Sequence, residues 1–210
     1  RDPAWGEGAA VIAGSERVSG WKQGEAHKDI PEGGKVWFAD LDFQPRNVWM
    51  LEGEKATRMA LARMPNWNES NPDDVKSECW NWEQPKWWEG KNKTTINGKL
   101  MHLGVDTKHL TQGEDCYKDA IVRSEWGIVM GTPFPSKVEA FDTEKKGIAF
   151  QGFWWGDSGT IIANNRYYLE DKPHYLDAPG EFWFERKGDG GRLYLRLPED
   201  RDPNGAVVEA

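Results

Sequence analysis

Short runs of apolar, β-branched and aromatic residues alternate along this chain with clusters of Gly, Pro, Asn and Asp. In the first third such runs occupy residues 9–13, 17–21, 35–41, 47–51 and 56–61. Later they occupy residues 120–122, 127–130, 137–141, 147–150, 159–163, 181–185, 192–196 and 206–209. Runs of this kind, bounded by turn residues, are typical of strands. The pattern therefore predicts a mainly β chain.

One hairpin is predicted more sharply than the other elements, and helix signals are few. Residues 182–184 and 193–195 form two apolar runs, and the Gly-rich segment 187–191 between them predicts a turn. Residues 72–76 could form one helical turn that begins after Asn71. Residues 118–124 fit either a helix or a strand, because their apolar spacing does not decide between the two.

Composition adds one unusual feature, a high tryptophan content. The 210 residues include 13 Trp, 23 Gly and 12 Pro. A chain of this length suits one large domain or two small ones. Tryptophan has a flat apolar face and one N–H donor, so it suits either packing in a core or stacking on a ligand.

Charge and motif content exclude several classes of function. The chain has 35 acidic and 27 basic residues, a net charge of −8, which disfavours nucleic acid or an anionic membrane as the main partner. No apolar run approaches the roughly 20 residues that cross a bilayer. The spacings of a zinc site, a phosphate-binding loop and a nucleophile elbow are absent. The two cysteines, Cys79 and Cys116, could form a disulfide or remain as two thiols.

Tryptophan concentrates in a segment at residues 65–93 that has almost no aliphatic residues. Trp80 and Trp82 would share one face of an extended segment, while Trp87 and Trp88 would point to opposite faces. Sugar rings stack on such aromatic faces, and amide and carboxylate side chains bind sugar hydroxyls. The alternative is that these tryptophans fold under the loop as a small core.

A second aromatic cluster, Trp154 and Trp155, stands just before Asp157. A carboxylate beside aromatic surface could bind a sugar hydroxyl or act as an acid. The alternative is a turn in which Asp157 bonds its own backbone.

Two sets of segments carry a resemblance to a known family. The first set is 36–41, 47–58 and 62–66, and the second is 165–170, 176–183 and 191–195 with Pro198. Their order resembles the N-terminal region of secreted bacterial proteins with a right-handed parallel β-helix of the pectate-lyase type. Many of those proteins are glycoside hydrolases or otherwise process polysaccharides.

The resemblance implies a domain organisation and a setting. Residues 1–21 would contribute short edge strands to an early rung of the parallel β-helix. Residues 22–205 would form an inserted antiparallel β-sandwich or barrel-like domain, and residues 206–210 would return to the β-helix. The protein would be secreted, extracellular or periplasmic, and the family's catalytic carboxylates would lie on later rungs outside this chain.

Acidic residues offer candidates without singling out an active site. Glycoside hydrolysis uses two carboxyl groups about 5 to 9.5 Å apart, and Asp157 and Glu181 are the candidates beside the aromatic and family-like segments. Asp200, Asp202 and Asn204 match the first half of a calcium-binding loop, although the same residues suit a solvated turn. Apart from calcium, the sequence suggests no cofactor.

The sequence therefore predicts a β-rich accessory domain of a secreted polysaccharide-degrading protein, which binds polysaccharide or oligosaccharide by tryptophan stacking. Two alternatives stay open. The domain could form one wall of a catalytic cleft, or it could cap the solenoid and bind nothing. By itself the chain is not expected to be catalytic.

Overall fold

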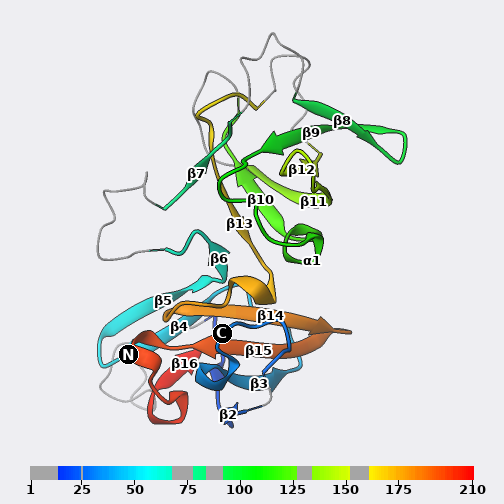
Figure 1. The fold of residues 1–210 in the computed structure, drawn as a ribbon. Coiled ribbons are helices and arrows are strands. Elements are labelled where there is room, and N and C mark those ends of the chain that lie inside the picture. The colour runs from blue at the N-terminus through cyan, green and yellow to red at the C-terminus, as the bar shows by residue number, and fades with distance from the viewer. Residues whose placement is uncertain (1–13, 25, 68–77, 84–91, 127–133, 152–160) are drawn as a thin grey trace, which may run out of the picture.

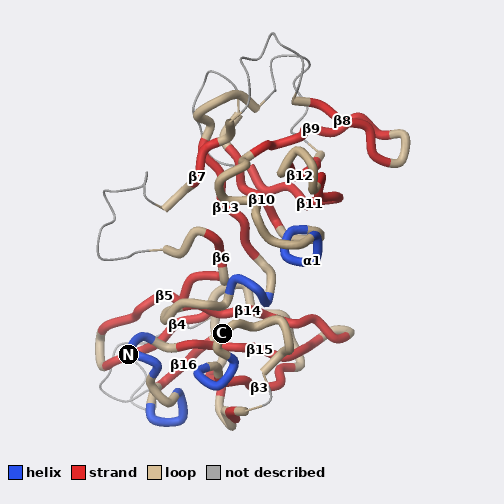
Figure 2. Tube along the Cα trace, in the orientation of Figure 1, coloured by secondary structure: helices blue, strands red, loops and turns tan. Residues whose placement is uncertain are grey.

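The computed structural model describes residues 14–24, 26–67, 78–83, 92–126, 134–151 and 161–210. These residues form two sheets of eight strands each, one above the other in Figure 1. Strand predominates over helix throughout (Figure 2). The mainly β prediction is confirmed.

The first sheet has the order β1-β16-β4-β5-β14-β15-β3-β2. Its strands are β1 (Arg17–Val18), β2 (Lys22–Gln23), β3 (Trp37–Leu41), β4 (Val48–Glu52), β5 (Lys55–Leu61), β14 (Glu181–Lys187), β15 (Gly190–Arg196) and β16 (Val207–Glu209). Strands β5 and β14 run parallel, and the other neighbours within this sheet run antiparallel.

The second sheet has the order β6-β13-β10-β11-β12-β9-β8, with β7 paired to β13, and its pairs are antiparallel. Its strands are β6 (Arg63–Met64), β7 (Trp80–Asn81), β8 (Lys93–Ile96), β9 (Lys99–Val105), β10 (Ile121–Ser124), β11 (Phe134–Asp142), β12 (Gly147–Phe150) and β13 (Arg166–Glu170). The helical elements of the described residues are short: α1 (Glu114–Tyr117) and the 3₁₀ turns Gly33–Lys35, Pro173–Tyr175, Pro198–Asp200 and Pro203–Gly205.

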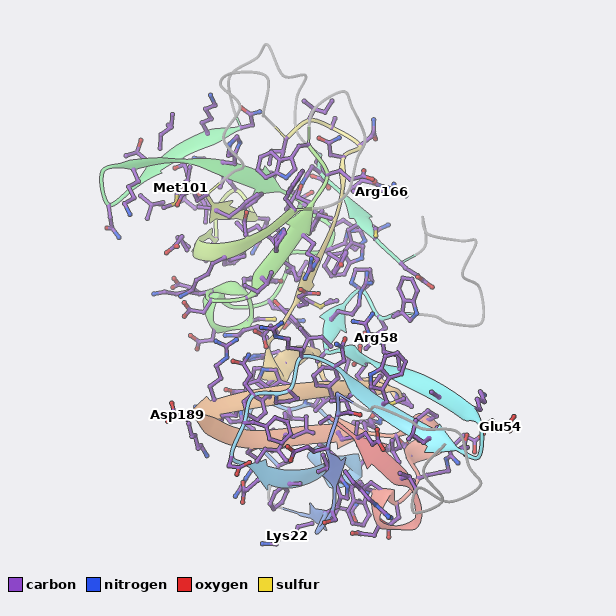
Figure 3. The ribbon with its side chains drawn as sticks, turned by 180° about the vertical axis from the view of Figure 1, so that it is seen from behind. Lys22, Glu54, Arg58, Met101, Arg166 and Asp189 are labelled. Carbon is purple, nitrogen blue, oxygen red and sulfur yellow. The ribbon has the colours of Figure 1, made fainter. Side chains whose placement is uncertain are left out.

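The predicted hairpin is confirmed as β14 and β15, with Phe182 opposite Leu195 and Lys187 opposite Gly190. The ladder continues almost to the tip, near Asp189 in Figure 3, so the turn is shorter than the predicted segment 187–191. Glycine is required beyond the turn as well. A Cβ on Gly190 would come 2.2 Å from the carbonyl oxygen of Leu41 on β3, closer than any side chain tolerates.

The main core lies where the two sheets meet, because its buried residues come from both. Phe38, Trp183 and Tyr194 of the first sheet belong to the same cluster as Phe150 and Leu169 of the second. A second cluster covers the other face of the first sheet. Strand side chains alternate between faces, so Trp183 packs in the first cluster while its neighbours in β14 pack in the second.

The expected parallel β-helix is not confirmed. Strand β1 pairs antiparallel with β16, and β16 pairs antiparallel with β4. The described parts of 1–21 and 206–210 thus extend the sheet formed by residues assigned to the inserted domain. The physical reason is that a short apolar run has the same side-chain pattern in parallel and antiparallel neighbours, so the run could not reveal its partner.

Several sequence predictions can be placed along the chain. Within the ambiguous segment 118–124, β10 is a strand. Residues 161–163 carry no strand. The predicted strands 9–13 and 127–130, and the helical turn 72–76, lie outside the described residues.

Candidate functional site

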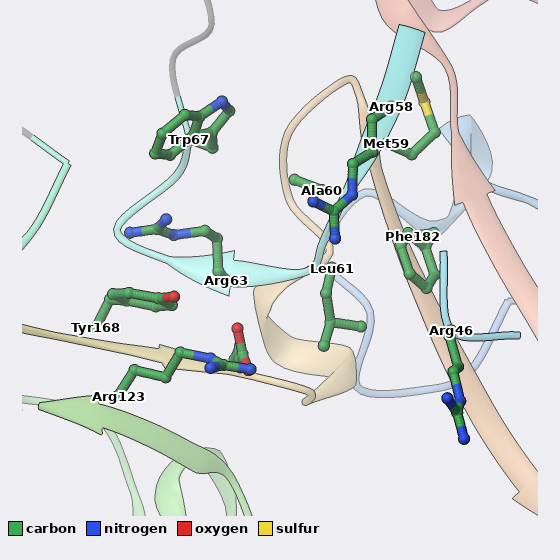
Figure 4. Close-up of a pocket in the computed structure, with 11 residues that line it drawn as sticks. Arg46, Arg58, Met59, Ala60, Leu61, Arg63, Trp67, Arg123, Tyr168 and Phe182 are labelled. Carbon is green, nitrogen blue, oxygen red and sulfur yellow. The ribbon is translucent and has the colours of Figure 1, made fainter. Parts of the chain in front are cut away.

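A cavity of about 560 Å³ opens where the chain crosses from one sheet to the other (Figure 4). Strand β5 of the first sheet is followed after Ala62 by β6 of the second. Seen from behind, Arg58 on β5 lies at the level where the sheets meet (Figure 3). The cavity is lined by Arg46, Arg58, Met59, Ala60, Leu61, Arg63, Trp67, Arg123, Tyr168, Glu170 and Phe182.

Arg63 organises the aromatic side of this cavity. Its side chain is only 7% exposed, and its guanidinium donates to the main-chain carbonyls of Pro65 at 3.0 Å and Glu78 at 2.5 Å. The same guanidinium lies 3.8 Å from the ring centre of Tyr168 and 5.5 Å from that of Trp67. Cation–π contacts of this kind orient both rings, and Figure 4 shows Arg63 between them. Trp67 is 42% exposed, so it offers aromatic surface at the cavity.

The remaining charged groups of the cavity leave an excess of positive charge. Arg123 donates from Nε to the Glu170 carboxylate at 2.6 Å, so this pair is neutral overall. Arg46 and Arg58 are exposed and pair with no carboxylate among the residues that the structure describes. Both guanidinium groups are thus open to an external ligand.

Glu181, one of the two catalytic candidates, lies enclosed at the start of β14. It is 2% exposed and accepts the main-chain N–H groups of Arg63 at 3.4 Å and Ala178 at 3.3 Å. Burial, with the nearby charge of Asp177, raises the pKa of Glu181 to about 8. The Glu181 carboxyl group thus links the start of β14 to β6 and is enclosed by protein groups. The other candidate, Asp157, lies outside the described residues.

The tryptophans proposed as a stacking platform occupy different environments. Trp82 is 2% exposed, stacks on Tyr167 with ring centres 3.5 Å apart, and donates from Nε1 to Ser124 at 2.9 Å. For Trp82 the structure matches the alternative of a core residue, because its ring packs on Tyr167 and its N–H is bonded to Ser124. Trp80 is half-buried and stacks on His109 at 4.6 Å. The other proposed residues, Trp87, Trp88, Trp154 and Trp155, lie outside the described residues.

A buried polar cluster that the sequence did not single out supports this aromatic stack. Asp106 is 1% exposed, and its Oδ2 accepts the Tyr167 hydroxyl at 2.8 Å. The same Oδ2 lies 2.8 Å from His109 Nδ1. Asp106 also accepts the main-chain N–H of Lys108 and of His109. One carboxylate therefore fixes the turn 107–109 and holds the rings that lie against Trp80 and Trp82.

The residues proposed for calcium are tied to protein groups. Asp200 accepts from Arg196 Nε at 2.6 Å, Asp202 accepts the main-chain N–H of Asn204 at 2.8 Å, and the Asn204 amide donates to the carbonyl of Trp21 at 3.2 Å. This arrangement matches the solvated-turn alternative. Within the described ranges, no three His, Cys, Asp or Glu residues are grouped to hold a metal ion.

Two further expectations can be compared with the structure. Cys79 and Cys116 are both free thiols, and burial raises the pKa of each, to about 11 for Cys116. In the part of the chain that is described, no helix has the length and apolar character to cross a membrane.

Sequence reasoning missed most of the cavity. Trp67 belongs to the predicted Trp-rich segment, but Arg46, Arg58, Arg123 and Tyr168 come from four separate segments. The three arginines lie within or beside apolar runs, where arginine usually faces solvent, and Tyr168 lies in the family-like segment 165–170.

Comparisons with known proteins support the fold. No protein-family model and no curated protein matches the sequence. A solved structure named "Glycoside hydrolase" is similar to 94% of this chain with a TM-score of 0.55 and 16% identity. The match covers 31% of that protein, so the chain spans about a third of its length. At this identity the likeness shows a shared β-rich fold.

Proposed function

We propose that this chain is a carbohydrate-binding accessory region of a larger secreted polysaccharide-processing protein, and that the cavity between the sheets is its saccharide site. The observation that carries the proposal is Trp67, an exposed aromatic ring at the edge of a cavity of about 560 Å³. Ligand cavities of about 300–1,000 Å³ with apolar walls and a few polar groups are typical small-molecule sites.

The cavity has the chemical groups that a sugar ring needs. Trp67 and Tyr168 can cover the C–H face of a pyranose, while Arg58 and the Arg123–Glu170 pair offer donors and acceptors for its hydroxyls. Met59, Leu61 and Phe182 supply apolar wall. The likeness to a structure named glycoside hydrolase supports carbohydrate as the ligand class. The proposal places the binding site at this surface and not at Trp82, because Trp82 is enclosed whereas Trp67 is exposed.

Catalysis is assigned to the rest of the larger protein. A glycosidase needs two reachable carboxyl groups across the scissile bond, and Glu181 is enclosed. The cavity itself is lined by one glutamate, whose carboxylate is held by Arg123. The proposal therefore gives this chain a role in positioning glycan.

A substitution at Trp67 tests the proposal. Trp67→Ala should weaken retention of the protein in gels that contain polysaccharide several-fold, because a lost aromatic contact is worth about 0.5–1.5 kcal/mol. The melting temperature should hardly change, because the ring is 42% exposed. Phe134→Ala on β11, which removes an aromatic ring that is 38% exposed, is the matched control.

The panel should contain xylan, methyl-esterified pectin, polygalacturonate and dextran sulfate. Retention of wild type in at least one gel, reduced in Trp67→Ala and unchanged in Phe134→Ala, supports the proposal. Absence of retention in every gel would favour the alternative of a structural cap without a ligand.

A further inference from the structure

Four arginines and a single glutamate line the cavity described above. We propose, building on the carbohydrate-binding role, that this cavity selects acidic saccharides and that Arg58, assisted by Arg46, binds the carboxylate or sulfate group of the sugar. Three observations support the proposal. They are the ion pairs and hydrogen bonds of the cavity's arginines, the positive charge of the cavity on a chain of negative net charge, and the positions of the side chains.

Two of the four arginines already form an ion pair or hydrogen bonds within the protein. Arg123 is neutralised by Glu170 at 2.6 Å. Arg63 is buried between Trp67 and Tyr168 and donates to main-chain carbonyls, so it positions the aromatic rings. Arg58 and Arg46 remain exposed, and in the described residues neither donates to a carboxylate. The uncommitted positive charge of the cavity therefore sits on these two side chains.

This charge stands out against an acidic chain. The protein has a net charge of −8, so its overall field repels anions, whereas the cavity has a local excess of arginine. A cavity with low-dielectric walls strengthens the local field of charges at its mouth. Met59, Leu61 and Phe182 provide such walls beside Arg58. The cavity is thus a place where an anionic group is favoured in spite of the net charge.

Arginine is also the side chain suited to this ligand chemistry. Its planar guanidinium donates two parallel hydrogen bonds to a carboxylate or to two oxygens of a sulfate. In Figure 4 Arg58 extends from β5 between the aromatic side, with Trp67, and the opposite side, with Arg46. A sugar ring against Trp67 could therefore direct an acidic substituent toward Arg58. Uronates and sulfated sugars share this chemistry and are separated by the test.

The experiment measures affinity by calorimetry for four probes in two matched pairs. Oligogalacturonate is compared with its methyl-esterified form, and a dextran sulfate oligomer with the uncharged dextran oligomer. We expect the full chain to bind one acidic probe at least tenfold more tightly than its neutral partner, and added salt to reduce the difference because it screens the charges. Selective binding of oligogalacturonate would identify a carboxylate as the recognised group, and selective binding of dextran sulfate would identify a sulfate.

Substitutions then test whether Arg58 binds the acidic group of the sugar. Arg58→Gln should reduce affinity for the acidic probe about 10- to 100-fold, as expected for a lost hydrogen bond to a charged group. Arg58→Lys should recover part of this loss, because it keeps the charge without the two-pronged geometry. Lys99→Gln in the exposed β8–β9 hairpin changes the net charge equally and should leave affinity unchanged.

The outcomes separate this inference from the proposed function. Equal affinity for acidic and neutral probes, with Trp67→Ala still harmful, would overturn charge selectivity while leaving carbohydrate binding in place. An equal loss in Arg58→Gln and Lys99→Gln would show a general charge effect and overturn the site. Binding of a single-stranded oligonucleotide of equal charge as tightly as the acidic saccharide would also contradict it. Absence of binding to all four probes would overturn charge selectivity, and absence of retention in every gel as well would overturn both proposals.

Discussion

The ring of Trp82 packs against two aromatic rings and forms one hydrogen bond. Tyr167 stacks on it, Phe150 lies 5.9 Å away between ring centres, and Ser124 accepts its N–H. The strand beside it carries Gly104, where a Cβ would come within 2.5 Å of the ring. Trp82 is thus part of the main core, and the space for it depends on a glycine in β9.

Truncating Trp82 should therefore unfold the protein more easily. We expect Trp82→Ala to lower the free energy of unfolding by about 3–5 kcal/mol, the usual cost of removing a large buried aromatic side chain. Urea denaturation followed by fluorescence measures this change. Trp67→Ala serves as the comparison, and its free energy of unfolding should be close to that of wild type. Equal losses of stability in the two variants would contradict the different burial of the two rings.

Glu181 gives the protein a specific pH dependence. Its pKa is raised from 4.5 to about 8 by burial and by Asp177, so between these values the folded protein binds a proton that the unfolded chain releases. The contribution of Glu181 to stability is therefore complete below about pH 4.5 and is lost as the pH rises through about 8.

A comparison with Glu181→Gln measures this effect, because groups that do not interact with Glu181 contribute equally to both proteins. Glutamine stays neutral, so the variant should gain stability relative to wild type as the pH rises from about 5 to 8. Urea denaturation at intervals of one pH unit provides the measurement. A difference that is constant over this range would mean that Glu181 is already ionised in the folded state.

At the scale of elements, local patterns predicted strands well and their partners poorly. The hairpin of β14 and β15 was recognisable because two apolar runs flank a glycine-rich turn. The β8–β9 hairpin was missed although it turns at Asn97 and Gly98, both with positive φ. Asn-Gly is the preferred sequence for such a turn, so the signal was present just after the tryptophan-rich segment 65–93 and was overlooked.

Other elements carried too little local information to be predicted. Strands β6 and β7 have two residues each, and they are fixed by pairing with β13. Helix α1 has one turn with no side-chain cap. The same limit applies to the cavity, because Arg46 before β4, Arg58 on β5 and Arg123 on β10 line one cavity only after the two sheets are assembled. Tertiary pairing, which a single sequence does not display, decides these features.

At the scale of the whole molecule, the crossing between the sheets joins the fold to the proposed function. The chain leaves the first sheet through β5 and β6 and returns to it through β13 and β14 (Figure 1). Glu181 links these two connections through the main-chain N–H of Arg63. The cavity lies against β5, β6 and β13, so a ligand there would contact both sheets at the point where the chain passes between them.

Amide hydrogen exchange of the full chain, with and without oligogalacturonate, tests this account most directly. Methyl-esterified oligogalacturonate serves as the parallel probe. We predict that the ligand slows exchange mainly in β5, β6 and β13, and that Trp67→Ala reduces the slowing at the same ligand concentration. Slowing confined to residues 80–88 or 154–155, with β5, β6 and β13 unchanged under both probes, would contradict a saccharide site between the two sheets.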